Sequence, residues 1–196
     1  GPAFEGAKIA CGMRGADGAI EHAHLVDGKL ECKVIGGGRP TGICGSGLID
    51  IIACLLDAGV IDESGKLLEN PRVVQIDENT KKAYLLADPL ESGDGKPVYL
   101  SQKDIREVQL AKGAIAAGIA LLAEQMGITL EQVEQVYIAG AFGNYMDPAG
   151  ACRIGMLPGV LKDRIIPVGN AAGEGAKLAL LNKEELKRAE RLARHT

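Results

Sequence analysis

Residues 136–144 are Val-Tyr-Ile-Ala-Gly-Ala-Phe-Gly-Asn, an apolar run that passes directly into a glycine-rich turn. Such a run is typical of a short buried strand that ends where the glycines begin. Asp147 and Pro148 follow, and this pair favours a helix start, with the aspartate as N-cap and the proline in the first turn. The stretch therefore predicts a strand, a glycine loop and a short helix in succession.

The same order recurs closer to the C-terminus. Ile165–Val168 is a second apolar segment, Gly169 and Asn170 follow it, and Ala171–Leu181 has a helical composition. Two strand–loop–helix units indicate an α/β fold with a mostly parallel sheet, in which ligands bind at the carboxyl ends of the strands. The charge-rich segment after Asn182 predicts one more helix with a solvated face.

The first half of the chain contains hairpin signals. Asp27 and Gly28 separate two alternating segments, Ile20–Val26 and Leu30–Ile35, and Asp-Gly between such segments is a strong hairpin signal. Further short apolar segments, separated by turn residues, lie at about residues 60–100. We expect that region to be a hairpin-rich excursion at the surface.

Ser101 and Asp104 predict a capping-box start for a long helix. Its apolar residues share one face, which should be core first and a homodimer interface only second. Gly113 and Gly118 lie inside this helix, where each costs about 1 kcal/mol relative to alanine. Their presence suggests close packing against another element. The residues of the apolar face are Ile105, Val108, Ile115, Ile119, Leu122 and Met126.

The composition excludes some classes of function. The 196 residues are 46% hydrophobic and 24% charged, as in ordinary globular proteins. The 22 Lys and Arg against 26 Asp and Glu give a net charge of −4, and aromatic residues are only 3% with no Trp. Without a basic stripe, this composition argues against a nucleic-acid partner. No apolar run approaches the length of about 18 residues that a membrane span needs.

The five cysteines, at positions 11, 32, 44, 54 and 152, form no C-x-x-C pair. An odd number without such pairs argues against a disulfide framework and against a local metal or iron–sulfur site, so a reducing, cytoplasmic setting is expected. His22 and His24 share one strand face. A polar edge is favoured there over a metal site, because no third ligand is nearby.

Glycine-rich segments are the candidates for ligand chemistry. Gly42–Gly47 should open a helix from Leu48 to Ala58, and backbone N–H groups at a helix start can bind phosphate. No segment matches the P-loop or the G-x-G-x-x-G pattern, so two alternatives stay open: a nucleotide or phosphate site, and turns that merely close the fold. Asp50 is open to two interpretations: it is a carboxylate that the helix dipole stabilises near the helix start, or it is a polar group that faces a nucleotide cleft. The four segments are residues 1–6, 42–47, 140–143 and 169–175.

Seven motifs lie in order along almost the whole chain: residues 1–7, 11–14, 18–21, 42–50, 109–115, 139–144 and 169–173. Together they resemble the reductive activators of corrinoid-dependent enzymes, ferredoxin-like proteins with a C-terminal domain of the acetate kinase/sugar kinase/Hsp70/actin (ASKHA) superfamily. The resemblance implies an actin-like or RNase H-like ATPase lobe with a mixed sheet, flanking helices and a β-rich insertion. Residues 1–196 would be a partial ASKHA domain, mostly its second lobe.

The resemblance further implies an ATP-dependent activator that restores cob(II)alamin to cob(I)alamin on a corrinoid partner. This partner would be a corrinoid iron–sulfur protein or the corrinoid subunit of a methyltransferase. Mg²⁺ would accompany the ATP, and Phe142 would either line the adenine site or fill the core. The expected ATP contacts are Gly45, Ser46, Gly47, Gly140, Ala141, Phe142, Gly143, Asn144, Gly169 and Asn170.

The family's Mg²⁺-holding carboxylates and its [2Fe–2S] cluster are expected upstream of Gly1. No catalytic residue and no metal ligand is therefore assigned in this chain, and we expect it to be inactive alone. Two alternatives remain open: a docking or dimerisation module with vestigial nucleotide loops, and a kinase-like lobe, which would need a catalytic acid and an acceptor pocket.

Overall fold

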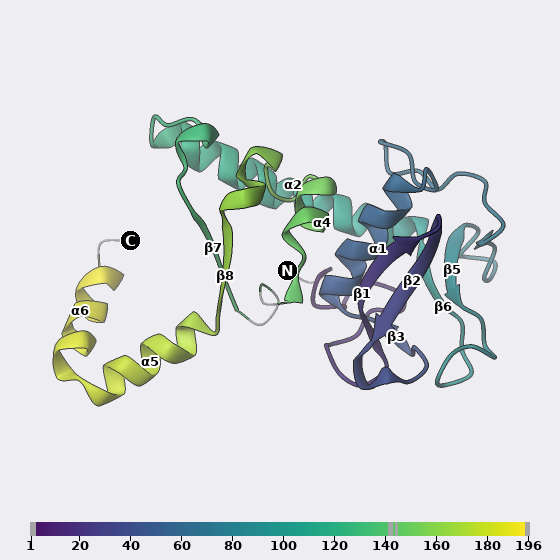
Figure 1. Cartoon of the computed structure of the whole chain (residues 1–196), viewed down its shortest axis with the longest axis horizontal. Coiled ribbons are helices and arrows are strands. Elements are labelled where there is room, and N and C mark those ends of the chain that lie inside the picture. The colour runs from purple at the N-terminus through teal and green to yellow at the C-terminus, as the bar shows by residue number, and fades with distance from the viewer. Residues whose placement is uncertain (1–2, 141–142, 144, 195–196) are drawn as a thin grey trace.

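The computed structural model describes residues 3–140, 143 and 145–194 of the chain (Figure 1). Its first sheet has the strand order β2-β1-β3. β1 (Ala19–Val26) pairs antiparallel with β2 (Lys29–Val34) and parallel with the short β3 (Gly42–Ile43). Asp27 and Gly28 make the turn with positive φ angles of 49° and 74°, which confirms the predicted hairpin.

Helix α1 (Gly45–Asp57) lies against β1, and every residue from Gly45 to Ala53 is buried. The helix begins at Gly45, three residues before the predicted start at Leu48. Gly42 and Ile43 pair with β1 as a strand, so the predicted glycine loop is shorter than expected. Gly47 is the point of closest approach: a Cβ atom there would lie 2.1 Å from the carbonyl oxygen of Ile20. The missing side chain is what lets the helix reach the strand.

A second, wholly antiparallel sheet has the order β4-β5-β6. Its strands are β4 (Val73–Val74), β5 (Ala83–Ala87) and β6 (Val98–Ser101). Helix α2 (Gln102–Gln125) follows β6 directly, and Ser101 and Asp104 form the predicted capping box.

The first turns of α2 belong to the core, with Ile105 and Val108 buried, whereas the second half of the helix is largely exposed. Leu122 is 63% and Met126 is 70% exposed. The prediction of close packing at Gly113 and Gly118 was wrong, because a Cβ at either position would have no atom within 4 Å among the described residues. The face predicted as core is therefore core only in its first part.

The C-terminal part consists of the parallel pair β7 (Val136–Ala139) and β8 (Ile165–Gly169), which carries two helices outward (Figure 1). Tyr137 is 62% exposed, so the prediction of a buried strand was wrong for β7 in this chain. Further helices among the described residues are α4 (Pro148–Arg153), α5 (Ala171–Leu181), α6 (Lys183–Ala193) and the 3-10 turns η1 (Ile35–Gly37), η2 (Leu130–Gln132) and η3 (Gly159–Arg164).

The architecture is the expected mixed α/β type, but the strands of the described part form three small sheets and pair mostly antiparallel in place of one mostly parallel sheet. The local helix signals near the C-terminus are confirmed. Asp147 caps α4 with Pro148 in its first turn, and Asn182 caps the exposed, charge-rich α6. Among the described residues, no helix combines the length and the apolar character that crossing a bilayer requires.

Exchanging Gly47 for alanine tests the contact between α1 and β1. Gly47→Ala should lower the free energy of unfolding by about 1–3 kcal/mol, because the new methyl group overlaps a backbone carbonyl that cannot move freely. Gly113→Ala is the matched control, which should be neutral or stabilise by up to about 1 kcal/mol. Urea denaturation measures both, and equal effects of the two substitutions would contradict the packing described here.

Amide hydrogen exchange tests the uneven distribution of the core. Helices α5 and α6 contain no buried residue, so their amides should exchange at least about tenfold faster than those of α1. Mass spectrometry of peptic peptides measures the ratio. Equal protection of α1 and α5 would show that the C-terminal helices are covered in solution.

Candidate functional site

The carboxyl ends of β7 and β8 lie side by side, as the parallel arrangement requires. The N–H of Gly140 donates to the carbonyl oxygen of Gly169 at 2.7 Å. Both residues have positive φ angles, 98° and 67°, which only glycine adopts without strain. Two of the predicted loops, residues 140–144 and 169–170, thus begin next to each other.

Two further predicted contacts serve the fold locally. The Asn170 side chain accepts from the N–H of Gly173 at 3.0 Å and caps α5. A Cβ on Gly143 would lie 2.3 Å from Cγ2 of Ile138, so glycine is required there for the chain to fold back over β7. The predicted contacts Ala141, Phe142 and Asn144 lie outside the described residues, and the two alternatives for Phe142 stay open.

A cavity of about 470 Å³ opens at the N-terminus of α1. Gly45 and Ser46 line it, and so does Tyr145, the residue directly after the predicted loop 140–144. Gly47, Gly140 and Gly169 are not among its lining residues. The lining consists of Phe4, Glu5, Ala7, Met13, Arg14, Gly15, Cys44, Gly45, Ser46 and Tyr145.

The chemistry of this cavity favours an anion. The first-turn N–H groups of a helix have no intrahelical acceptor, and the helix dipole adds partial positive charge at that end. The side chains there are bound elsewhere: Cys44 Sγ donates to the carbonyl oxygen of Ile20 at 3.3 Å, and Ser46 Oγ donates to that of Glu21 at 2.8 Å. The exposed Arg14 adds a full positive charge at the rim.

The volume fits a small-molecule ligand, since such sites enclose about 300–1,000 Å³. Among the described residues, Glu5 is the one carboxylate that lines the cavity. The described residues contain no group of three or more His, Cys, Asp or Glu side chains that could hold a metal ion. The cavity therefore fits the phosphates of a nucleotide better than it fits a protein-bound metal.

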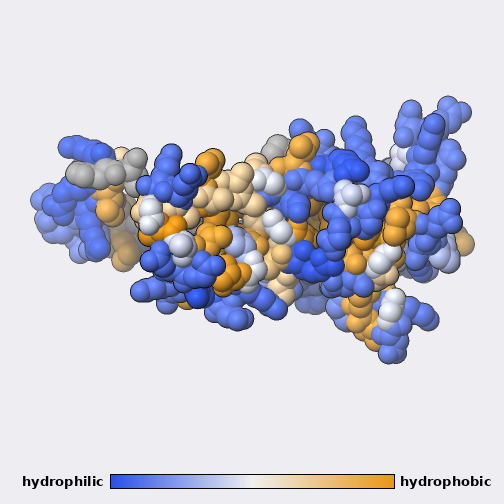
Figure 2. Space-filling view, turned by 90° about the horizontal axis from the view of Figure 1, so that it is seen from above, coloured by the Kyte–Doolittle hydropathy of each residue, from blue (hydrophilic) through white to orange (hydrophobic). Residues whose placement is uncertain are grey.

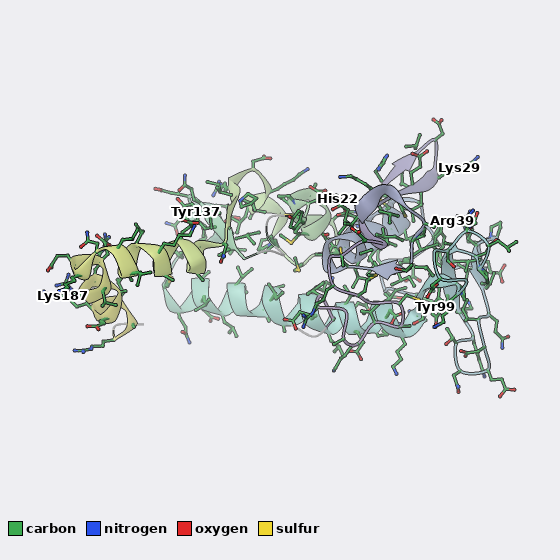
Figure 3. All side chains as sticks on the ribbon, turned by 90° about the horizontal axis from the view of Figure 1, so that it is seen from below. His22, Lys29, Arg39, Tyr99, Tyr137 and Lys187 are labelled. Atoms are coloured by element: carbon green, nitrogen blue, oxygen red, sulfur yellow. The ribbon has the colours of Figure 1, made fainter. Side chains whose placement is uncertain are left out.

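Asp50 faces β1 and not this cavity. Its Oδ2 lies 2.9 Å from Nδ1 of His22, a β1 residue labelled in Figure 3, and accepts weakly from the N–H of Ala23 at 3.4 Å. Its Oδ1 has no hydrogen-bond partner among the described residues. Burial raises the pKa of the Asp50 carboxyl, and the hydrogen bond from His22 opposes this rise. Asp50 therefore anchors α1 to β1. It lies in the second turn of α1, so its expected place in the first turn, where the helix dipole favours a carboxylate, was wrong, and it does not line the α1 cavity.

The two histidines differ in their surroundings. His22 is half-buried against Asp50, whereas the exposed His24 lies 3.8 Å from Glu31 on β2. Nothing brings a third metal-ligating group to them among the described residues. The favoured interpretation of a polar strand edge thus fits His24, while His22 has a structural partner that its sequence neighbours did not reveal.

Residues 1–196 match the family described as the C-terminal domain of RACo, the ASKHA domain. The chain belongs to this family. Its relatives include a corrinoid activation enzyme, RamQ, of Eubacterium limosum, 42% identical over 193 residues that cover 94% of this chain and 32% of the relative. A reductase named as acting on a Co(II) methylated amine-specific corrinoid protein, from Methanosarcina barkeri, is 30% identical over 95% of this chain and 35% of its own length.

A solved structure confirms the fold of this RACo C-terminal domain. A reductive activator for a corrinoid, iron–sulfur protein superposes with a TM-score of 0.90 at 38% identity, over 99% of this chain and 31% of that chain. The chain thus spans about a third of the length of the relatives it matches. The predicted family and the ASKHA-type fold are confirmed.

Removing the imidazole tests the pairing of His22 with Asp50. At pH 7, His22→Ala should lower the free energy of unfolding by about 1–3 kcal/mol, because a buried carboxylate loses its strongest partner. His24→Ala, at the exposed pair, should change it by less than about 0.5 kcal/mol.

The effect of His22→Ala should shrink as the pH falls towards 4. The pKa of Asp50 is raised in the folded state, so the folded protein binds this proton more readily than the unfolded chain does. Protonation removes the buried charge that needs His22. Chemical denaturation at several pH values measures this, and a loss that is independent of pH would contradict a charged Asp50 as the cause.

Proposed function

We propose that this chain provides the nucleotide-binding surface of an ATP-dependent activator, which returns the cobalt of a corrinoid protein from Co(II) to Co(I). The observation that carries the proposal is the cavity at the start of α1, where Gly45, Ser46, Arg14 and Tyr145 meet. The activities for which the relatives are named support the same function, although these proteins are about three times longer.

Two groups of residues bind the two parts of the nucleotide, its phosphates and its nucleoside. The first turn of α1 and Arg14 bind the phosphates, because N–H donors and a guanidinium converge on the cavity there. The loop that follows β7, residues 140–144, together with Gly169 and Asn170, binds the nucleoside. Mg²⁺ would accompany the phosphates, and the carboxylates that hold it would come from outside this chain.

ATP hydrolysis would supply the free energy for an otherwise unfavourable one-electron reduction of the corrinoid. The electron would come from a [2Fe–2S] cluster in another domain. This chain's contribution is to bind and orient the nucleotide. All five of its cysteines are free thiols, in keeping with a reducing, cytoplasmic setting.

The exposed apolar side chains of the C-terminal half form a surface that fits the rest of an ASKHA domain. Figure 2 shows apolar residues reaching the surface along this part of the molecule. We propose that a further region, of the kind by which the relatives exceed this chain in length, covers them, with a second copy of this chain as the alternative. They include Leu121, Leu122, Met126, Tyr137, Leu178, Leu180 and Leu181.

Arginine replacement tests the phosphate site. Arg14→Ala should weaken the binding of a fluorescent ATP analogue by about tenfold, the loss of one charge-assisted pair, and should change adenosine binding by less than twofold. Competition with unlabelled ATP, ADP and adenosine, followed by fluorescence anisotropy, measures the difference.

Arg39→Ala is the matched control, because Arg39 is bound to the carbonyl oxygen of Leu90 and does not line the cavity. It should leave all three affinities unchanged. Equal loss of ATP and adenosine affinity in Arg14→Ala would place the phosphates elsewhere. If the unmodified chain bound no nucleotide, that result would contradict the proposal that this chain alone provides a nucleotide-binding surface.

A further inference from the structure

A second depression, of about 1120 Å³, lies at the start of α2. Three segments that are far apart in the sequence line it: residues 7–10, residues 79–82 before β5, and residues 101–104 with 106–107 at the end of β6 and the start of α2. We call this depression the basic groove. Ala7 lines both the basic groove and the cavity at α1, so the two sites adjoin.

Positive charge dominates the basic groove in a chain whose net charge is −4. One of its two carboxylates, Asp104, is buried and accepts from the N–H groups of Ala10 and Ser101. The other, Glu107, lies 3.5 Å from Lys8. The cationic lining residues are Lys8, Lys81, Lys82, Lys103 and Arg106, all of them exposed.

Three of these cations are available to a partner. Among the described residues, Lys81, Lys82 and Lys103 make no side-chain hydrogen bond and no ion pair. The N–H of Gln102 donates to the carbonyl oxygen of Lys82 at 3.1 Å, which joins the segment before β5 to the start of α2. All three lysines are exposed, so their ammonium groups stand in solvent.

We infer that the basic groove is a docking surface for an acidic face of another protein, and that this protein is the corrinoid protein on which the activator acts. The second part of the inference rests on the proposed function. The groove is wide, and its cations stand on three segments, which suits an extended acidic surface, whereas a small anion needs donors that converge.

The alternatives fit the groove less well. A permanent interface with the rest of a longer chain would bury apolar side chains, and none of the exposed large apolar side chains among the described residues lines the groove, since most of them lie on the C-terminal half of the molecule. A nucleic-acid partner is disfavoured by the net charge and by the 3% aromatic content. Because the groove adjoins the α1 cavity, a protein bound in it would sit beside the nucleotide.

A triple substitution tests the inference. Lys81→Ser, Lys82→Ser and Lys103→Ser are combined, and the control combines Lys29→Ser, Lys96→Ser and Lys183→Ser, three exposed lysines outside the groove (Lys29 is labelled in Figure 3). Both variants have the same net charge. The probes are poly-L-glutamate and the Co(II) form of a methylated amine-specific corrinoid protein, measured by biolayer interferometry at low and at moderate salt.

We expect the groove variant to bind both probes at least about tenfold more weakly than the control, and salt to narrow this difference, since three screened charge pairs are lost. Equal binding of poly-L-glutamate by the two variants would overturn the acidic docking surface. Groove-dependent binding of poly-L-glutamate, with no groove-dependent binding of the corrinoid protein, would overturn the corrinoid protein as the occupant.

ATP titration of the same variants separates this inference from the proposed function. Both variants should keep the ATP affinity of the unmodified chain, and equal urea midpoints would show that both are folded. Groove-dependent protein binding in a chain that binds no ATP would leave the docking surface in place and would contradict the nucleotide site alone.

Discussion

The contact between α1 and β1 is the constraint on which the rest of the structure depends. The helix can lie directly on the strand because Gly47 has no side chain to collide with the carbonyl of Ile20. The hydroxyl of Ser46 is bound to the backbone of β1, and one turn later Asp50 is bound to His22. These bonds fix the first turns of α1, so the N–H groups that face the cavity keep their direction without a ligand. Such preorganisation lowers the cost of binding an anion.

Most elements could be predicted from the sequence where their signals are local. The turn at Asp27-Gly28 and the capping box of Ser101 and Asp104 involve residues within a few positions of each other, and both formed as expected. Long-range packing was not visible. His22 and Asp50 are 28 positions apart, and nothing near either residue indicates the other. The glycines of α2 led to a wrong prediction of close packing, because helix propensity gives the free-energy cost of a glycine and not what lies beside it.

The candidate site was predicted in part. Glycine-rich turns marked Gly140 correctly as a place of unusual backbone, whereas Gly45 is an ordinary helical residue that lines the α1 cavity. Glycines that admit a ligand and glycines that admit a neighbouring strand look alike in a sequence. Gly47 and Gly143 belong to the second kind, since a Cβ on either would strike the protein itself. Arg14 lay in a recognised motif, yet only the fold brings it to the start of α1. The basic groove has no sequence signature at all, because its lysines come from three separate segments.

The length of α2 also limits how this fold can vary. Its 24 residues extend over about 36 Å at 1.5 Å per residue, from the buried cap at Asp104 to the strands that carry the glycine loops. Each residue of a helix turns the chain by about 100°, so inserting or deleting one residue in α2 would rotate everything beyond it relative to α1. Changes in chain length are far better accommodated by the exposed turns between β5 and β6. Homologous chains should therefore differ in length at those turns and keep the residue count of α2 constant.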